Sequence, residues 1–198
     1  MRFLHVQLQL PGWVEAALPA PEHVFASEEE RMGLVVELAR ENVRKGTGGP
    51  FAAAVFDRRR GTLLAPGVNL VEPANCSAAH AEVVACMVAQ QMVESYDLGG
   101  EGPPGYELVT STEPCTMCLG AVLWSGVRRL VCGARREDAE ALGFDEGPRP
   151  QDWVEELARR GIAVRREVLR EEAAEVLREY ARAGGTIYGP RDGPVPRQ

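Results

Sequence analysis

Residues 110–124 read TSTEPCTMCLGAVLW, and they join a β-rich segment to an apolar, helix-like run through a proline and two cysteines. Pro114 suits the first position of the helix. Cys115 and Cys118 are three positions apart, so both sulfur atoms point to one side of its first turn. A helix N-terminus lowers the pKa of a thiol, which favours the thiolates that a metal ion requires. The stretch therefore predicts a strand-to-helix junction that carries a redox pair, part of a structural zinc site or part of a catalytic one.

Strands and helices alternate on both sides of this junction. Ser27 and Glu30 form a capping box before an amphipathic helix that Gly46 ends. The connection from Gly133 to Gly161 holds a helix, so the strands that flank it should be parallel. These features predict an α/β fold with helices layered on a sheet. The other expected elements are strands near 50–57, 63–71, 107–111, 129–132 and 162–168, and helices near 78–95, 152–161 and 171–184.

The composition narrows the class of protein. The 198 residues are 45% hydrophobic and carry a formal net charge of −7, which suits one domain without the basic field of a nucleic-acid binder. The arginine runs at 58–60, 128–129 and 135–136 are short and have acidic neighbours. No apolar run approaches the ~18 residues of a membrane span. Five cysteines without a targeting signal favour the cytoplasm, and neither a membrane nor nucleic acid is an expected partner.

Residues 1–26 are expected to form an N-terminal extension of the domain. In MRFLHVQLQL, apolar residues at positions 4, 6, 8 and 10 alternate with polar ones, which predicts an extended arm or an edge strand. Residues 27–184 are expected to form one domain that carries the chemistry. Residues 185–198 follow as a C-terminal tail.

A second chemical motif, CSAAHAEVVAC at 76–86, places His80 and Glu82 at the expected start of a helix. The other two histidines of the chain lie in the extension. His80, Cys115 and Cys118 are ligands that tetrahedral Zn²⁺ prefers, and a set of three leaves a position for water. Two thiolates cancel the charge of the metal and weaken its effect on that water, so a nearby base is needed. Glu82 is expected to act there as a proton shuttle and not as a ligand.

Other interpretations of these cysteines stay open at this point. Cys76 as a fourth ligand would make the zinc site structural, and the protein would then be a zinc-stabilised interaction module without enzymatic activity. A redox pair would suit the strand–CxxC–helix context but would leave His80 and Glu82 without a role. Cys86 and Cys132 are expected to be buried thiols of the core.

The HAE and PCTMC motifs resemble the zinc-dependent cytidine deaminase superfamily, whose signature has this pattern. The similarity covers about residues 28–189 and includes GGPFAAAVF, GVNLV, CLGAVLWSGV and GFDEG, which are most similar to the bacterial guanine deaminase branch. The resemblance implies a three-layer α/β/α fold around a five-stranded mixed sheet, with the last two strands parallel, usually in a homodimer. It also implies one Zn²⁺ per chain and hydrolysis of the purine base guanine to xanthine and ammonia.

The resemblance also implies roles for single residues beyond the three zinc ligands and Glu82. Asn69 matches a residue that holds the edge of the purine, and Trp124 falls where an aromatic wall lies beside the base. Glu146, in GFDEG, matches an acid near the substrate amino group, with Asp145 as the fallback. Each has a plainer alternative, since Asn69 can cap a turn, Trp124 can belong to the core and Glu146 can be a solvated acid.

Two further aromatic residues are candidates for contact with the base. Phe51 can stack on it, although a phenylalanine of the core is the simpler interpretation. Tyr188 lies in a C-terminal segment that, in some members of the branch, closes the pocket of the same chain or of the partner subunit. With Gly185 before it, this segment is expected to act as a lid.

The substrate is the remaining choice. Deamination of adenosine in tRNA uses the same zinc chemistry, but the acidic composition and the GFDEG loop argue against it. Cytosine or nucleoside deamination is a third alternative, which the long crossover before the last strand disfavours. Amino-oxo-s-triazines are expected as weak substrates, because they place the amino carbon between two ring nitrogens as guanine does.

Overall fold

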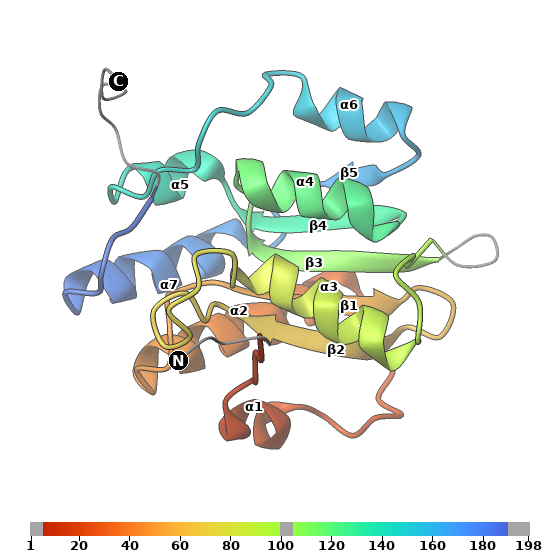
Figure 1. Cartoon of the computed structure of the whole chain (residues 1–198), viewed down its shortest axis with the longest axis horizontal. Helices are drawn as coiled ribbons and strands as arrows, with labels where there is room; N and C mark the ends of the chain where they lie inside the picture. The colour runs from red at the N-terminus through yellow and green to blue at the C-terminus, as the bar shows by residue number, and fades with distance from the viewer. Residues whose placement is uncertain (1–5, 100–104, 190–198) are drawn as a thin grey trace.

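The computed structural model describes residues 6–99 and 105–189, which form one five-stranded mixed sheet (Figure 1). The strands are β1 (Ala52–Asp57), β2 (Thr62–Val68), β3 (Tyr106–Thr112), β4 (Arg129–Ala134) and β5 (Ala163–Arg165), in the order β2-β1-β3-β4-β5. Strand β1 is antiparallel to β2 and β3, whereas β3, β4 and β5 are parallel to one another. The predicted mixed sheet and its last parallel pair are confirmed.

Helices cover both faces of the sheet, which gives the three predicted layers (Figure 1). The helices are α1 (Gly12–Ala17), α2 (Glu28–Arg44), α3 (Ala81–Met92), α4 (Thr116–Ser125), α5 (Arg136–Glu140), α6 (Trp153–Arg159) and α7 (Arg170–Arg182). On β1, Ala52, Ala54 and Phe56 pack into the core formed with α2 and α7. Ala53 and Val55 pack into the core formed with α3, α4 and α6. The strand is buried on both faces because its side chains alternate between the two cores.

The first long helix begins as its sequence predicts. Ser27 Oγ accepts a hydrogen bond of 3.1 Å from the backbone N–H of Glu30. The Glu30 carboxylate accepts one of 2.7 Å from the N–H of Ala26, one residue earlier than in a standard capping box. Met32 is fully buried on the face that meets the sheet, and Gly46 follows the helix with a φ of 61°. The capping residue and the apolar face together determine where α2 starts and how it packs.

Several element boundaries differ from the sequence-based expectation. Helix α3 begins at Ala81 and not near 78, because His80 is extended and serves as its N-cap residue. Strand β5 has three residues and not seven, and the short helices α1 and α5 were not expected. Residues 6–10 form no strand, although Leu8 and Leu10 pack against the core; residues 1–5 of the expected arm lie outside the described residues.

Gly67 allows α3 to lie very close to β2. A Cβ atom at this position would lie 2.4 Å from the carbonyl oxygen of Ala81 and 2.5 Å from the backbone nitrogen of Ala85. Any larger residue would therefore push the helix away from the strand. This close approach determines the position of His80 and Glu82 at the start of α3.

Over the described ranges, no helix has both the length and the apolar character needed to cross a membrane.

Candidate active site

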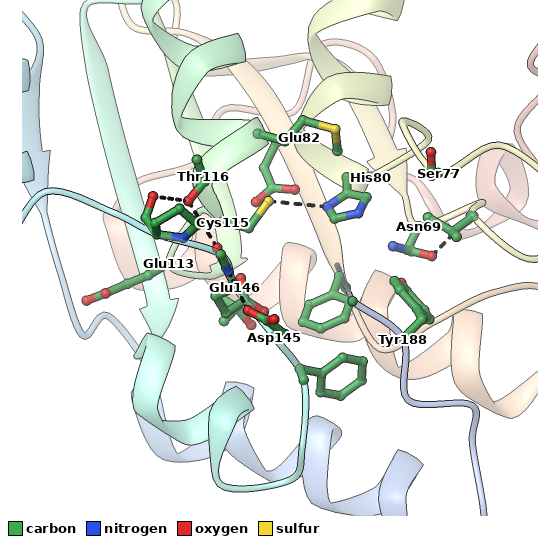
Figure 2. A pocket seen from close by; sticks show the side chains of 18 residues that line it. Asn69, Ser77, His80, Glu82, Glu113, Cys115, Thr116, Asp145, Glu146 and Tyr188 are labelled. Carbon is green, nitrogen blue, oxygen red and sulfur yellow. Dashed lines mark hydrogen bonds between the residues drawn. The ribbon is translucent and has the colours of Figure 1, made fainter. Parts of the chain in front are cut away.

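A cavity of about 520 Å³ lies at the carboxyl end of β3, where ligands commonly bind in sheets with parallel strands (Figure 2). The N-termini of α3 and α4 form its floor, and the loop after β2, the loop after α5 and the chain after α7 surround it. The lining side chains used below are Phe51, Asn69, His80, Glu82, Thr112, Glu113, Cys115, Thr116, Met117, Phe144, Glu146 and Tyr188. Segments far apart in the sequence thus meet at one site.

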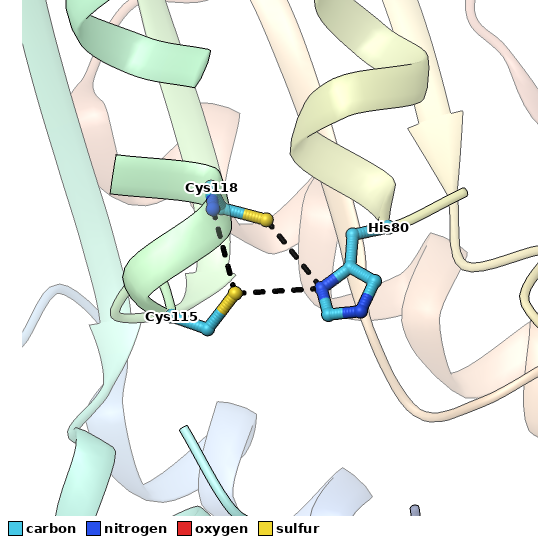
Figure 3. A group of neighbouring side chains, drawn as sticks. All are labelled: His80, Cys115 and Cys118. Atoms are coloured by element: carbon cyan, nitrogen blue, oxygen red, sulfur yellow. Dashed lines mark hydrogen bonds between the residues drawn. The ribbon is translucent and has the colours of Figure 1, made fainter. Parts of the chain in front are cut away.

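His80, Cys115 and Cys118 converge in this cavity with the geometry of a metal site (Figure 3). Cys115 Sγ and Cys118 Sγ lie 3.6 Å and 3.5 Å from His80 Nδ1. Tetrahedral zinc, with bonds of about 2.3 Å to sulfur and 2.0–2.1 Å to nitrogen, requires a sulfur–nitrogen separation of about 3.6 Å. The three residues therefore fit zinc. Among residues 6–99 and 105–189, they form the one such group of histidine, cysteine or acidic side chains, and Cys76 is not part of it.

The environment of Cys115 favours its thiolate. The pKa of Cys115 is lowered to about 4 by hydrogen bonds from the Cys118 thiol and from His80, while the same bond and burial raise the pKa of the donor, Cys118. The backbone N–H of Cys118 also donates to Cys115 Sγ at 3.4 Å, because Cys115 is the N-cap residue of α4. By contrast, burial raises the pKa of the Cys86 thiol to about 12. Cys86 and Cys132 are buried free thiols, as predicted, and Cys115 has the ionisation that a metal ligand requires.

Glu82 lies beside the metal ligands without belonging to their group (Figure 2). Its side chain is 7% exposed, and its Oε2 accepts a hydrogen bond of 3.3 Å from the Cys118 thiol. Burial, followed by the charge of Cys115, raises the pKa of Glu82. His80 is the N-cap residue of α3 and Glu82 lies in its first turn. Because the N-terminus of this helix faces the cavity, both side chains reach it although they are only two residues apart. Such a carboxyl group can accept and release a proton next to the metal.

Glu146 reaches the same cavity from the loop after α5. It is 9% exposed, and burial, followed by the charges of Cys115 and Glu82, raises its pKa to about 8. The neighbouring Asp145 is exposed and accepts a hydrogen bond of 2.8 Å from the N–H of Gly147. The structure therefore places Glu146, and not the fallback Asp145, among the buried groups of the site.

Aromatic side chains form the wall opposite the metal ligands. The Phe51 and Phe144 rings meet edge to face with centroids 5.1 Å apart, and the Tyr188 ring lies 5.8 Å from Phe144 and 6.3 Å from His80. Burial raises the pKa of Tyr188 well above its ordinary value. The Tyr188 hydroxyl has no well-formed hydrogen bond within the described chain. These rings leave a flat apolar space that a planar base can enter.

Asn69 presents an unpaired amide group to the cavity. Its Oδ1 accepts a hydrogen bond of 3.2 Å from the N–H of Val71, but its buried Nδ2 makes no well-formed hydrogen bond among the described residues, and the Tyr188 hydroxyl beside it likewise makes none. The buried hydroxyl of Thr112, a residue that no sequence motif singled out, also has no partner among the described residues. A buried donor without a partner is costly, so a bound molecule is the natural partner for these groups.

Trp124 does not reach the cavity of its own chain. Its side chain is 88% exposed and does not line the cavity. It lies six residues after Cys118 on α4, which is about 240° around the helix at 3.6 residues per turn. The metal ligand and the tryptophan therefore lie on different sides of α4, and the expected aromatic wall in this chain consists of Phe51, Phe144 and Tyr188.

Replacement of single cysteines tests the metal site. Purified protein should contain one zinc per chain, and Cys118→Ser should lose it because two ligands bind zinc weakly. Metal analysis by plasma mass spectrometry and zinc-edge X-ray absorption should show two sulfur ligands. Cys86→Ser is the matched control, and Cys76→Ser should also keep its zinc; loss of zinc in Cys76→Ser would show a four-ligand structural site.

Comparison with known proteins places this geometry in a family. The sequence model of the cytidine and deoxycytidylate deaminase zinc-binding region matches residues 26–134. Guanine deaminase of Bacillus subtilis (strain 168) is 40% identical over 111 residues, 56% of this chain and 67% of the relative. Solved structures of guanine deaminase from Nitrosomonas europaea and of a mutant protein in complex with 8-azaguanine each superpose with a TM-score of 0.86 at 50% identity, covering 92% of this chain and 99% of theirs. The chain belongs to the cytidine and deoxycytidylate deaminase zinc-binding family.

Proposed function

We propose that this protein is a zinc-dependent guanine deaminase, which converts guanine and water to xanthine and ammonia. The observation that carries the proposal is the presence of two buried acids, Glu82 and Glu146, on one cavity with the metal ligands. The similarity to guanine deaminases over nearly the whole described chain supports the choice of base. Zinc, when bound by His80, Cys115 and Cys118, promotes the ionisation of water for attack.

Glu82 performs the first proton transfer in this proposal. Water adds to the ring carbon that carries the amino group, and Glu82 accepts the proton that the water loses. It then donates that proton to the adjacent ring nitrogen, so that one O–H bond of water is broken while the ring gains one C–O bond to the hydroxyl group and one N–H bond. The burial of Glu82 supports this role, since a raised pKa lets a carboxyl group hold the proton between the two steps.

Glu146 assists departure of the amine. Breaking the carbon–nitrogen bond requires a proton on the amino nitrogen, and the hydroxyl that came from water loses one as the carbonyl of xanthine forms. A second carboxyl group near the base can deliver the proton that the amino nitrogen needs. Glu146 suits this task because burial raises its pKa and so favours the protonated form.

The cavity suits a free base better than a polynucleotide. Phe51, Phe144 and Tyr188 surround a flat space, and the buried amide of Asn69 can donate to the edge of a purine. Tyr188 lies over this space, where the nucleotides flanking an adenosine in tRNA would have to pass. The net charge of −7 also opposes binding of the phosphate backbone of a tRNA.

Replacement of the two acids tests the mechanism. Glu146→Gln should lower kcat for guanine by ~10²–10⁴-fold, the range for a positioned general acid or base, and Glu82→Gln should be nearly inactive. Both variants should keep zinc and thermal stability. Ammonia and xanthine release would be measured on guanine, adenine, cytosine, guanosine and an amino-oxo-s-triazine.

Asp145→Asn is the comparison variant: Asp145 also lines the cavity, but its side chain is exposed, and asparagine keeps the oxygen that accepts the Gly147 N–H. Its kcat should equal that of the wild type. Full activity in Glu146→Gln would show that Glu82 performs both transfers, whereas turnover of adenine at the rate of guanine would contradict the proposed substrate.

The proposal includes a division of the chain into a catalytic domain, residues 27–184, and a C-terminal tail, residues 185–198. In this proposal, the part of the tail that carries Tyr188 closes the site. Gly184 has a φ of 74°, which only glycine adopts readily, and it turns the chain from α7 toward the cavity. The Tyr188 ring then contacts the Phe144 ring, and both side chains line the pocket. Closure of this kind excludes water from the reacting base.

Two truncations test the lid. A chain that ends at Gly184 should keep its zinc and its fold but lose most of kcat/KM, since the base is then open to solvent. A chain that ends at Gly189 keeps Tyr188 and should retain activity, which makes it the matched control. Equal kcat/KM in the two truncated chains would rule out the lid.

Helix α4 also presents an apolar face that supports a homodimer. Met117, Gly120, Ala121 and Trp124 follow one another at helical spacing on its outer side, with Met117 39% and Trp124 88% exposed. Large contiguous apolar patches on a protein surface mark interaction sites, and this stripe could form the centre of one in a dimer. Because Met117 also lines the cavity, a second copy of the chain on this face would lie at the rim of the active site.

Trp124→Glu should therefore convert the dimer to monomers, as measured by analytical ultracentrifugation at micromolar concentration. A charge in the middle of an apolar interface removes its main contact. Tyr96→Glu is the matched control, since Tyr96 is 86% exposed but lies beyond the end of α3. A dimer that survives Trp124→Glu would place the interface elsewhere.

The thiol chemistry favours the cytoplasm as the location. All five cysteines are free, and Cys115 and Cys118 must stay reduced to bind zinc.

A further inference from the structure

Glu146 acts from a loop, and its position therefore needs an explanation. Residues 144–150 contain no helix or strand. Near Glu146, the backbone is tied to α4 by a hydrogen bond of 3.0 Å from the Thr116 N–H to the Glu146 carbonyl oxygen, and the Thr116 hydroxyl donates to the Pro148 carbonyl oxygen at 2.5 Å. A catalytic acid in such a loop needs firmer support, because small displacements of a reacting group greatly reduce the rate.

Arg149, three residues after Glu146, supplies this support through a buried ion pair. Its Nη2 donates to Glu113 Oε2 at 2.8 Å, and the side chains of Arg149 and Glu113 are 7% and 0% exposed. The Arg149 guanidinium group also lies 4.4 Å from the centre of the Trp153 ring. Its Nη1 donates to the carbonyl oxygen of Pro114 at 3.4 Å, next to the metal ligand Cys115. One side chain thus joins the loop to the segment that holds the metal.

Glu113 is held from the opposite side as well. Its Oε1 accepts a hydrogen bond of 2.6 Å from Arg166 Nε, just after β5. Its backbone N–H donates to the Ala134 carbonyl oxygen at 2.9 Å, which fixes its backbone between β3 and β4. Figure 2 shows the Glu113 side chain pointing away from His80 and Cys115. Because two arginines pair with its carboxylate, Glu113 suits a structural role and not proton transfer.

We infer that the Arg149–Glu113 ion pair positions Glu146 against the substrate and the metal ligands, which makes Arg149 and Glu113 positioning residues for the deamination. The inference rests on the proposed role of Glu146 as the second acid. A buried arginine that donates to two different acceptors suits this task because its planar guanidinium group fixes both distance and direction, whereas lysine fixes only a charge. The aromatic ring of Trp153 restricts the guanidinium plane further.

Kinetics of Arg149 variants test the inference. Arg149→Met should lower kcat for guanine by ~10–10²-fold with little change in KM and with zinc retained, because the acid and not the binding site is displaced. Arg149→Lys should lie between Arg149→Met and the wild type. Arg159→Met is the matched control, since Arg159 also pairs with acids but is 56% exposed, and it should behave as the wild type.

A double-mutant cycle separates positioning from general support of the fold. In a Glu146→Gln background, Arg149→Met should cause almost no further loss of kcat, because the group that it positions is already absent. Hydrogen exchange should become faster in peptides over 143–150, independently of activity. Where Arg149→Met fails to fold, Arg149→Lys in both backgrounds decides the same question.

Three results would overturn the inference: an unchanged kcat in Arg149→Met, an equal loss of kcat in the Glu146→Gln background, or loss of zinc, which would show that the pair supports Cys115 instead. Failure of the proposed function looks different. A wild-type enzyme that releases no xanthine from guanine would contradict the function, whereas an active wild type with an equally active Arg149→Met would contradict only the positioning role.

Discussion

Two helix N-termini meet at the carboxyl end of β3, and the chemistry of the protein depends on this meeting. Helix α3 contributes His80 as its N-cap residue, and α4 contributes Cys115 as its own N-cap residue. The positive end of each helix dipole favours anionic groups there, which suits thiolates. Because α3 can approach β2 only through Gly67, the packing of the sheet sets the distance from His80 to both sulfur atoms.

Burial creates an electrostatic problem around this junction. Cys115 is held as a thiolate, and burial followed by the charge of Cys115 raises the pKa of both Glu82 and Glu146; the charge of Glu82 raises the pKa of Glu146 further. A divalent cation at the three ligands relieves the repulsion, so metal binding and acid chemistry depend on the same arrangement. Glu113, only two residues from Cys115, avoids the problem because Arg149 and Arg166 neutralise it. The cavity thus separates acids with a chemical role from one that supports the structure.

Local sequence signals and the structure agree where the interaction is short in range. The Ser27 cap, the apolar face of α2 and the i, i+3 spacing of the cysteines each act within one or two helical turns, and all three were predictable. The crossover between β4 and β5 was predictable from its length, since only parallel strands need one. Element ends were less certain, because the extended backbone of His80 and the three-residue β5 depend on neighbours distant in sequence.

The sequence by itself determined the fold class, the zinc ligands and the presence of Glu82 beside them, because motifs and periodicity encode residue types and local geometry. Only the tertiary structure decided which side chains share the cavity. It placed Trp124 on the solvent side of α4, Tyr188 beside Phe144, and the unpaired hydroxyl of Thr112 inside the pocket. It also revealed the contact between Arg149 and Glu113, which are 36 residues apart. Contacts of this kind arise from the packing of whole elements, and no local pattern specifies them.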